Sequence, residues 1–252
     1  MDTTKKFSGK AQIYEKYRPG YTKECIQYIL GTLDSAKHNK IADIGAGTGI
    51  FSKHLLEQGQ QVIAVEPNDD MRLEAEKKLK QYPLFSALKA SAEDTGLEEH
   101  SIDLITVAQA FHWFDALKFQ KECSRILKPD GKVFLIWNSR DPESDLVKEN
   151  AQVCAAFCPD FTGFSGGERG TKEETFRTFF RDGKYEMKKF ANDLYFDKKG
   201  FIGRNLSASY ALKEGDENYE AFIIALKALF NKYQEDNKIL LENTIQCYSG
   251  TV

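Results

Sequence analysis

Three glycines at alternate positions, between two apolar segments, carry the strongest chemical signal in the sequence. Gly45, Gly47 and Gly49 follow directly on the apolar residues 41–44, a stretch that also contains Asp43. Glycine tolerates positive φ and lets a ligand approach backbone amides without a Cβ in the way. The spacing therefore predicts a ligand-binding turn, Ala46 included, that leads from a strand into a helix.

A carboxylate follows the next apolar segment. Residues 61–65 are mostly apolar and are followed by Glu66 and Pro67. If this second strand lies parallel to the first, Glu66 stands beside the glycine turn, where a carboxylate can accept both hydroxyls of a ribose. Losing such a buried acceptor costs about 1–3 kcal/mol. This strand–turn–helix–strand unit predicts a site for a cofactor that carries a nucleoside.

The glycine spacing distinguishes two classes of cofactor. Dinucleotide sites use G-x-G-x-x-G beneath a pyrophosphate, whereas this turn reads G-x-G-x-G after Asp43. That carboxylate would repel a pyrophosphate but suits a ligand with an amino group and no phosphate. Asp43-Ile-Gly-Ala-Gly-Thr-Gly49 resembles the first motif of class I S-adenosylmethionine-dependent methyltransferases, which implies S-adenosylmethionine as the cofactor. An NAD(P)-dependent oxidoreductase, a non-catalytic cofactor-binding module and a purely structural turn remain the alternatives.

Composition limits the other function classes. The 252 residues are 41% hydrophobic and carry a formal net charge of −3, with no dense basic cluster, so a nucleic-acid substrate is disfavoured. The polar amino terminus and short apolar runs predict neither a signal peptide nor a membrane span. Five scattered cysteines fit a reducing cytoplasm. Cys154 and Cys158 have no further ligand nearby, so no metal is expected, and we expect a monomer or homodimer.

The amino-terminal segment has the composition of a lid. Tyr14-Glu-Lys-Tyr-Arg-Pro-Gly-Tyr21 resembles the opening of a methyltransferase subgroup similar to the trans-aconitate methyltransferases. The resemblance implies that Arg18 pairs with the methionyl carboxylate. It also implies that Tyr14 or Tyr17 covers the sulfonium, with Tyr17 extending toward the substrate. An amphipathic arm packed on the core is the alternative.

A third strand, residues 84–90, is predicted to end near the adenine of the cofactor. By the same resemblance, the backbone of Ala92 would contact the adenine ring, and Ser91 or Glu93 would contact the exocyclic amine. Ser91 stands where the family commonly has aspartate, which leaves this side-chain contact open. Glu93 could equally be a solvated acid of the turn.

The fourth strand, residues 101–107, runs into an aromatic loop that includes Gln109, Phe111, His112 and Trp113. Ligands of open parallel sheets bind outside the carboxyl ends of the strands. The loop resembles the fourth motif of the subgroup, which flanks the transferable methyl group. We therefore expect Gln109 near the cofactor, with Trp113 and His112 near the substrate. His112 is the candidate general base or substrate orienter, although it could merely pack the loop.

The remaining pattern completes the fold. We predict a helix over 116–127, a strand over 132–137, a sixth strand over 184–196 and a seventh over 243–248. The segments 139–183 and 197–240 are too long for plain connections. They predict a helical cap, in which Ser207, Ser209 and Tyr210 would face the substrate by resemblance.

The predicted architecture is an α/β, Rossmann-like, seven-stranded and mostly parallel sheet with helices on both faces and a cap from insertions after strands 5 and 6. Residues 1–38 would form the lid and first helix, 39–138 the cofactor-binding core, and 139–252 the cap with strands 6 and 7. The predicted activity is S-adenosylmethionine-dependent methyl transfer to an oxygen or nitrogen of a small molecule, with carboxylates among the acceptors.

Overall fold

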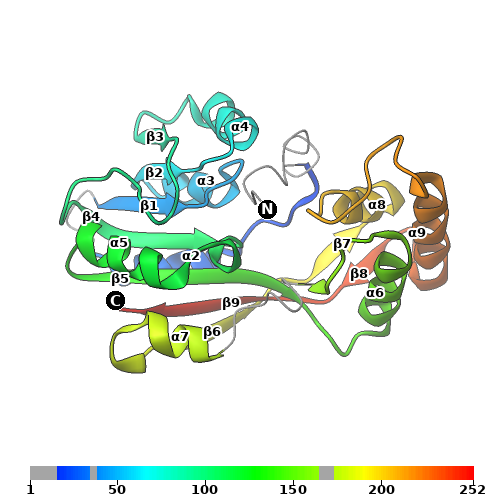
Figure 1. Ribbon diagram of the computed structural model, residues 1–252. Coiled ribbons are helices and arrows are strands. Elements are labelled where there is room, and N and C mark those ends of the chain that lie inside the picture. The colour runs from blue at the N-terminus through cyan, green and yellow to red at the C-terminus, as the bar shows by residue number, and fades with distance from the viewer. Residues whose placement is uncertain (1–15, 35–38, 165–172) are drawn as a thin grey trace.

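The computed structural model describes residues 16–34, 39–164 and 173–252. A seven-stranded sheet in the order β3-β2-β1-β4-β5-β9-β6 forms its body (Figure 1). The first five strands in that order run parallel, and β9 pairs antiparallel with both β5 and β6. The predicted fold class is confirmed. The strands are β1 (Lys40–Ile44), β2 (Gln61–Val65), β3 (Phe85–Leu88), β4 (Ile102–Ala108), β5 (Leu127–Arg140), β6 (Glu186–Ala191) and β9 (Asn243–Gly250).

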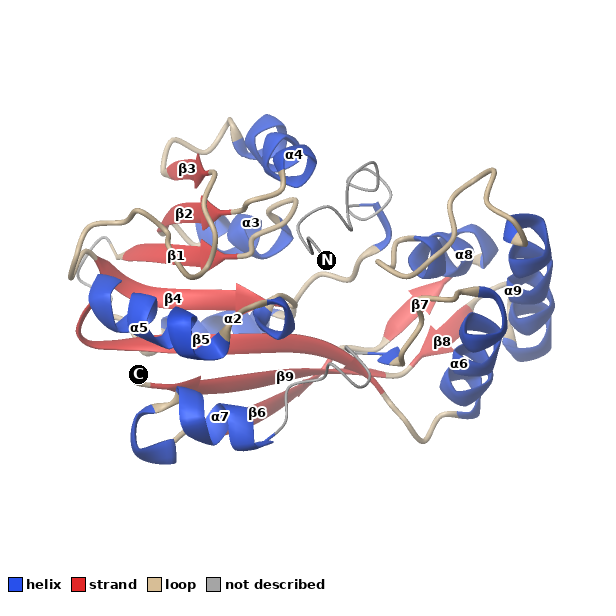
Figure 2. Cartoon of the chain, viewed as in Figure 1, coloured by secondary structure: helices blue, strands red, loops and turns tan. Residues whose placement is uncertain are grey.

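Helices cover both faces of this sheet (Figure 2). One apolar cluster joins the sheet to α2 (Lys23–Leu30), α3 (Ile50–Glu57) and the last turn of α4 (Asp69–Leu79). The other joins it to α5 (Ala116–Ile126) and α7 (Glu173–Phe179). Burial of both faces explains why the central strands are continuously apolar.

The placement of α7 differs from the prediction. Phe176, Phe179 and Phe180 belong to the main core, where Phe179 stacks 5.6 Å from Phe119 of α5. The segment 139–183 is therefore not wholly cap, because its second half returns to the sheet. Sequence periodicity identifies the apolar face of this helix but not the surface against which it packs.

The cap has a core of its own. It contains α6 (Asp145–Phe157), α8 (Lys198–Leu206), α9 (Tyr219–Tyr233) and a two-stranded sheet of β7 (Leu194–Phe196) and β8 (Ile239–Leu241). Their buried side chains form a separate apolar cluster. Figure 1 shows β5 and β9 running from the main sheet toward this cap.

Two predicted strand boundaries were wrong. The single strand over 184–196 is divided at Asn192 and Asp193 into β6 and β7, which belong to different sheets. The strand expected over 132–137 is β5, whose bounds run from Leu127 to Arg140 and include an irregularity at residues 128–131, with Asp130 at φ 65°. Within the described ranges, no helix is both long and apolar enough to cross a membrane.

Candidate functional site

A pocket of about 250 Å³ opens at the carboxyl ends of β1 to β5. This is the edge of the sheet at which open α/β folds bind ligands. The glycine turn, the amino-terminal segment, the aromatic loop and α8 all contribute to its wall. Among the predicted site residues, those that line it are Arg18, Gly45, Ala46, Gly47, Glu66, Pro67, Ala92, Glu93, Gln109 and Trp113.

Gly45 and Gly47 fit the turn for different reasons. Gly45 has φ +69°, and a Cβ there would lie 2.5 Å from the Cβ of Ala110. Its amide donates to the carbonyl of Val65 at 2.8 Å, which ties the turn to β2. Gly47 has φ +57°, and a Cβ there would have nothing within 4 Å, so its surface faces the open pocket. The backbone of the turn is thus fixed on the side that packs against β2 and Ala110, and it is uncovered on the side that faces the pocket.

Gly49 lies beneath the turn, outside the pocket wall. It caps the amino end of α3 at φ 78°. A Cβ there would lie 2.7 Å from Cδ1 of Leu79, so this glycine permits α3 to pack closely against α4. The sequence motif predicts contact with the cofactor, whereas the placement of Gly49 assigns it a packing role.

Asp43 is also placed differently from the expectation. It is fully buried, and its two carboxylate oxygens accept hydrogen bonds from Ser52 Oγ at 2.6 Å and Thr106 Oγ1 at 2.9 Å. Burial raises the pKa of this carboxyl from 3.8 to about 6, against the lowering effect of both hydrogen bonds. Asp43 therefore ties α3 and β4 to β1 and supports the turn from behind, where the motif predicts direct contact with a ligand.

Glu66 stands at the end of β2 with only 9% of its surface exposed. Its Oε2 accepts the amide of Gly47 at 2.9 Å, and its Oε1 accepts the amide of Asn68 at 2.8 Å. Burial raises the pKa of this carboxyl, while the two amides act to lower it. These bonds fix the carboxylate beside the turn and leave it further acceptor capacity toward the pocket.

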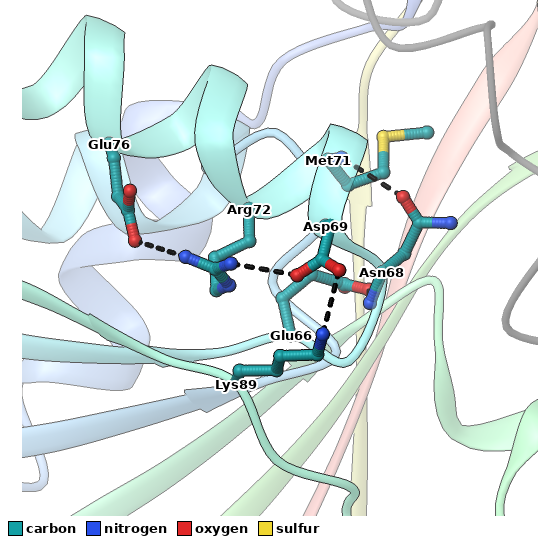
Figure 3. A network of polar contacts seen from close by, with 7 residues as sticks. All are labelled: Glu66, Asn68, Asp69, Met71, Arg72, Glu76 and Lys89. Carbon is teal, nitrogen blue, oxygen red and sulfur yellow. Dashed lines mark hydrogen bonds and ion pairs between the residues drawn. The ribbon is translucent and has the colours of Figure 1, made fainter.

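The start of α4 fixes the next part of the wall. Asn68 lines the pocket, and its Oδ1 caps α4 by accepting the amide of Met71 at 3.0 Å (Figure 3). On the same helix, Arg72 pairs with Asp69 at 2.8 Å and with Glu76 at 2.6 Å. The cap and the ion pairs hold the helix start rigidly next to Glu66.

The loop after β3 forms the far wall. Ala92 is buried and lines the pocket together with Ser91 and Glu93. Oε1 of Glu93 accepts the amide of Asp115 at 2.9 Å, which joins this loop to the start of α5. Glu93 thus lines the pocket, where the sequence predicts it, and also joins two loops at the pocket edge.

Only some residues of the aromatic loop after β4 line the pocket. Gln109, at φ 62°, and Trp113 line the pocket. His112 is half-buried, its ring centroid 4.7 Å from that of Trp113, and it is not among the described residues of the pocket wall. A base role for His112 would require the loop to turn its ring toward the reacting atoms.

The amino-terminal segment is anchored on three sides. Nη2 of Arg18 donates to the carbonyl of Ser207 in the cap at 3.1 Å, and the amide of Tyr21 donates to Nε2 of His54 at 3.4 Å. The carbonyl of Gly20 accepts the side-chain amides of Asn138 and Asn192 at 3.3 and 3.2 Å. Arg18 and Tyr21 are thereby held in the pocket wall.

Tyr17 and Tyr210, which the sequence predicts near the cofactor or the substrate, lie away from the pocket wall. The ring of Tyr17 occupies the space beside Gly203 of α8, where a Cβ would come within 2.5 Å of it. Tyr14 lies outside the described residues. Tyr210 packs in the cap with its ring 4.8 Å from that of Phe161. Neither Tyr17 nor Tyr210 is among the described residues that line the pocket.

The pocket wall also contains Asn138 and Arg204, which the sequence motifs do not indicate. Asn138 lies at the end of β5, and its Oδ1 accepts the side-chain amides of Asn192 at 2.8 Å and Asn243 at 3.0 Å. Arg204, on α8, is 6% exposed and reaches the same pocket. The strand-end rule could have identified Asn138, whereas the inward face of α8 had no signal in the sequence.

Comparison with known proteins identifies the class of this site. Residues 42–135 match the family model described as a methyltransferase domain. An uncharacterised methyltransferase of Mycobacterium tuberculosis H37Rv is 35% identical over 152 residues, which are 60% of this chain and 60% of that protein. An uncharacterised methyltransferase-like protein of Schizosaccharomyces pombe is 31% identical, over 64% of this chain and 62% of its own.

Solved structures agree on the fold. A proposed type II methyltransferase of Anaeromyxobacter dehalogenans has a TM-score of 0.66 at 23% identity, covering 93% of this chain and 98% of its own. A phosphoethanolamine N-methyltransferase of Haemonchus contortus, solved with S-adenosylhomocysteine, has a TM-score of 0.56 at 15% identity, covering 96% of this chain and 57% of its own.

The fold and the glycine turn therefore define a methyltransferase domain over residues 42–135. The match of residues 42–135 and the similarity to uncharacterised methyltransferases support a class I S-adenosylmethionine-dependent methyltransferase domain, with S-adenosylmethionine as its cofactor. The chain spans about 60% of the length of the curated relatives it matches.

Proposed function

We propose that this protein transfers a methyl group from S-adenosylmethionine to a small-molecule acceptor. Of the possible acceptor atoms, oxygen or nitrogen, we propose a carboxylate oxygen. The observation that carries the proposal is a pocket lined by a glycine turn, an acidic strand end and two arginines, Arg18 and Arg204. We further propose a relation to the trans-aconitate type of enzyme, a cytoplasmic location and a monomeric or homodimeric state, without a nucleic-acid partner.

The residues at the turn fit the cofactor. Gly47 offers a bare surface at the pocket, and Glu66 offers a fixed carboxylate beside it for ribose hydroxyls. Ala92 and Glu93 would lie along the adenine, and Arg18 would pair with the methionyl carboxylate. Guanidinium and carboxylate groups form strong, often bidentate hydrogen bonds, so this pairing would also fix the orientation of the cofactor.

The bound cofactor supplies an electrophilic methyl group on a sulfonium sulfur. A carboxylate oxygen held in line with that methyl group would take it as the carbon–sulfur bond broke, and the bonding pair would stay on sulfur as a neutral thioether. With a carboxylate acceptor, the products are a methyl ester and S-adenosylhomocysteine, and no proton has to leave. The residues of this chain then act chiefly by aligning the reactants, which can supply about 7–11 kcal/mol.

Charge at the cap side of the pocket supports an anionic acceptor. Arg204 of α8 is 6% exposed and, like Arg18, contributes to the pocket wall. A guanidinium has five donors, so an arginine of the wall can bind a carboxylate in addition to its partners within the protein. A carboxylate is ionised at neutral pH and could serve both as partner and as nucleophile.

The role of His112 separates carboxylate acceptors from alcohols and phenols. A carboxylate needs no base, so His112→Ala should change turnover only a few-fold on such a substrate. An alcohol or phenol would have to lose a proton, and loss of a general base typically costs about 10²–10⁴-fold. Unchanged turnover on the physiological acceptor would remove His112 from the chemistry.

The proposal is tested with S-adenosylmethionine labelled on the methyl group and a panel of carboxylic acids, phenols and amines. Alkaline treatment of the labelled product releases methanol from a methyl ester but not from an ether or a methylamine. Base-labile label that requires the enzyme supports the carboxylate proposal. Base-stable label would move the acceptor to another class, and cofactor binding without transfer to any acceptor would favour a non-catalytic binding module.

A further inference from the structure

The imidazole of His54 contacts the amino-terminal segment beside the pocket. His54 lies in the last turn of α3, the helix that begins directly after the glycine turn. Its Nε2 accepts the backbone amide of Tyr21 at 3.4 Å, and the two rings meet edge to face with centroids 6.2 Å apart. A Cβ at Gly20 would lie 3.3 Å from the same nitrogen, so the backbone before Tyr21 also passes close to the ring. His54 therefore joins α3 to this segment.

The segment that His54 contacts supplies part of the pocket wall. Arg18, Pro19 and Tyr21 line the pocket. The ring of Tyr21 also meets that of Phe51 on α3 edge to face, with centroids 4.8 Å apart, and Phe51 lines the pocket as well. His54 is not among the described residues of the wall. Its effect on a bound cofactor would therefore act through the residues that it holds in place.

The hydrogen bond from Tyr21 requires one protonation state of His54. A ring nitrogen accepts a hydrogen bond only when it carries no proton, so the hydrogen of neutral His54 must lie on Nδ1. Protonation turns Nε2 into a second donor, which then opposes the amide of Tyr21. The contact between α3 and the segment is therefore complete when His54 is neutral and weakened when His54 is charged.

The surroundings of His54 favour its neutral form. Burial lowers the pKa of His54 from its usual 6.5, while Glu57 acts to raise it and Lys53 acts to lower it. Nδ1 of His54 lies 3.8 Å from Oε2 of Glu57. Glu57 in turn pairs with Lys53 at 3.6 Å and accepts the hydroxyl of Tyr82 at 3.5 Å. Within the described ranges, the charges that act on His54 thus come from α3, and the segment faces it with the aromatic ring of Tyr21.

We propose that His54 is a positioning residue that holds the amino-terminal segment in the pocket wall only while its ring is neutral, so that protonation of His54 weakens cofactor binding. This inference rests on the proposed function for the identity of the ligand. Cofactor binding then favours neutral His54, so the affinity is fully present above the pKa of His54 and declines as the pH falls through it. Because that pKa lies below 6.5, the decline is expected below pH 6.5.

The experiment is a calorimetric titration of S-adenosylhomocysteine into the wild type and His54→Gln at pH 8, 7, 6 and 5. Glutamine offers an oxygen that can accept the amide of Tyr21 but does not titrate. We expect the two affinities to agree within about threefold at pH 8. At pH 5 the wild type should bind about fivefold or more weakly than His54→Gln, as expected for a donor that has lost its acceptor. Asp43 and Glu66 titrate in both proteins, so their effects cancel in this ratio.

Three further variants test the origin of the pH dependence. His54→Phe keeps a ring but has no acceptor, so its affinity should already be about fivefold lower at pH 8. Glu57→Gln removes a carboxylate that raises the pKa of His54, so the loss of affinity should move to lower pH. His100→Gln changes an exposed histidine whose Nδ1 lies 2.9 Å from the carbonyl of Leu127, and it should keep the pH profile of the wild type.

A second measurement requires no ligand. In nuclear magnetic resonance spectra of the free protein, the amide signal of Tyr21 should shift with pH at the same midpoint as the ring signals of His54. In His54→Gln, the Tyr21 amide should show no transition at that midpoint. A side chain that merely fills space beside the segment would not produce this common midpoint.

The outcomes distinguish this inference from the proposed function. An equal pH profile of affinity in the wild type and His54→Gln overturns the inference, as does a Tyr21 amide signal that does not titrate with His54. Absence of S-adenosylhomocysteine binding at every pH overturns the proposed function, and the positioning role falls with it even if the Tyr21 amide titrates. A pH-dependent loss of affinity that His54→Gln removes, together with the common midpoint in the free protein, supports the inference.

Discussion

The two sides of the pocket are built by different means. On the side of the main sheet, the backbone of the glycine turn and the buried carboxylate of Glu66 form the wall, and Gly47 and Glu66 are joined by a 2.9 Å hydrogen bond. On the cap side, the wall depends on the long side chain of Arg204, and the amino-terminal segment reaches the cap through the bond from Arg18 to Ser207. Under the proposed function, the sheet side is a rigid cofactor half, and the cap side is an acceptor half assembled from distant segments.

The most severe test of the rigid half is Gly45→Ala. A non-glycine residue at φ +69° is strained by about 1–3 kcal/mol. At this position, overlap with Ala110 at 2.5 Å adds to that strain. We expect a clear loss of unfolding free energy and loss of detectable S-adenosylhomocysteine binding, measured by denaturant unfolding and calorimetry.

Gly96→Ala is the matched control, because Gly96 has the same φ of +69° but nothing within 4 Å of a Cβ. It should show the backbone strain alone and keep its affinity for the cofactor product. Equal effects of the two substitutions on stability and binding would mean that the close contact behind the turn is unimportant.

The buried carboxyl of Asp43 should make the unfolding free energy of the protein depend on pH. Because its pKa is about 6 in the folded protein against a usual 3.8, its contribution to stability is fully present below about 3.8 and is lost as the pH rises through 6. The unfolding free energy of the wild type relative to Asp43→Asn should therefore increase by about 2 kcal/mol from pH 7 to pH 4, at up to about 1.4 kcal/mol per pH unit. Denaturant unfolding of both proteins at several pH values measures this difference, and a constant difference would refute the assignment.

The smallest expected effect concerns the junction between the two halves. Asn192→Ala removes the 3.2 Å bond to the Gly20 carbonyl and the 2.8 Å bond to Asn138. We expect about threefold to tenfold weaker S-adenosylhomocysteine binding, as for one or two neutral hydrogen bonds, with little change in melting temperature. Asn237→Ala, in the loop before β8, is the control and should change neither. An unaltered affinity in Asn192→Ala would separate the amino-terminal segment from cofactor binding.

The same division explains what the sequence could predict. The turn, Glu66 and the strand ends lie within short, regularly spaced stretches, so local pattern sufficed for the sheet and for ten of the residues that line the pocket. Asp43 and Gly49 belong to the same motif, but spacing alone could not tell a residue behind the turn from one in front of it. Arg204 lies on a helix whose inward face depends on tertiary packing.

Contacts between segments that are far apart in the sequence could likewise not be predicted. The asparagines at 138, 192 and 243 meet only because β9 lies between β5 and β6 in the sheet. Local propensity also failed to place α7, whose phenylalanines fit either core equally well by composition. The sequence information was thus sufficient where function resides in one contiguous motif and insufficient where it is assembled from several.

The central claim is that Glu66 and the glycine turn bind S-adenosylmethionine. It is tested most directly by calorimetric titration of S-adenosylmethionine and S-adenosylhomocysteine into the wild type, Glu66→Gln and the exposed-site control Glu143→Gln. The account predicts binding of both ligands by the wild type and the control, and affinity about 10- to 100-fold lower in Glu66→Gln, the range for a hydrogen bond to a charged group. Absence of binding by folded wild type, or equal binding by Glu66→Gln, would contradict it.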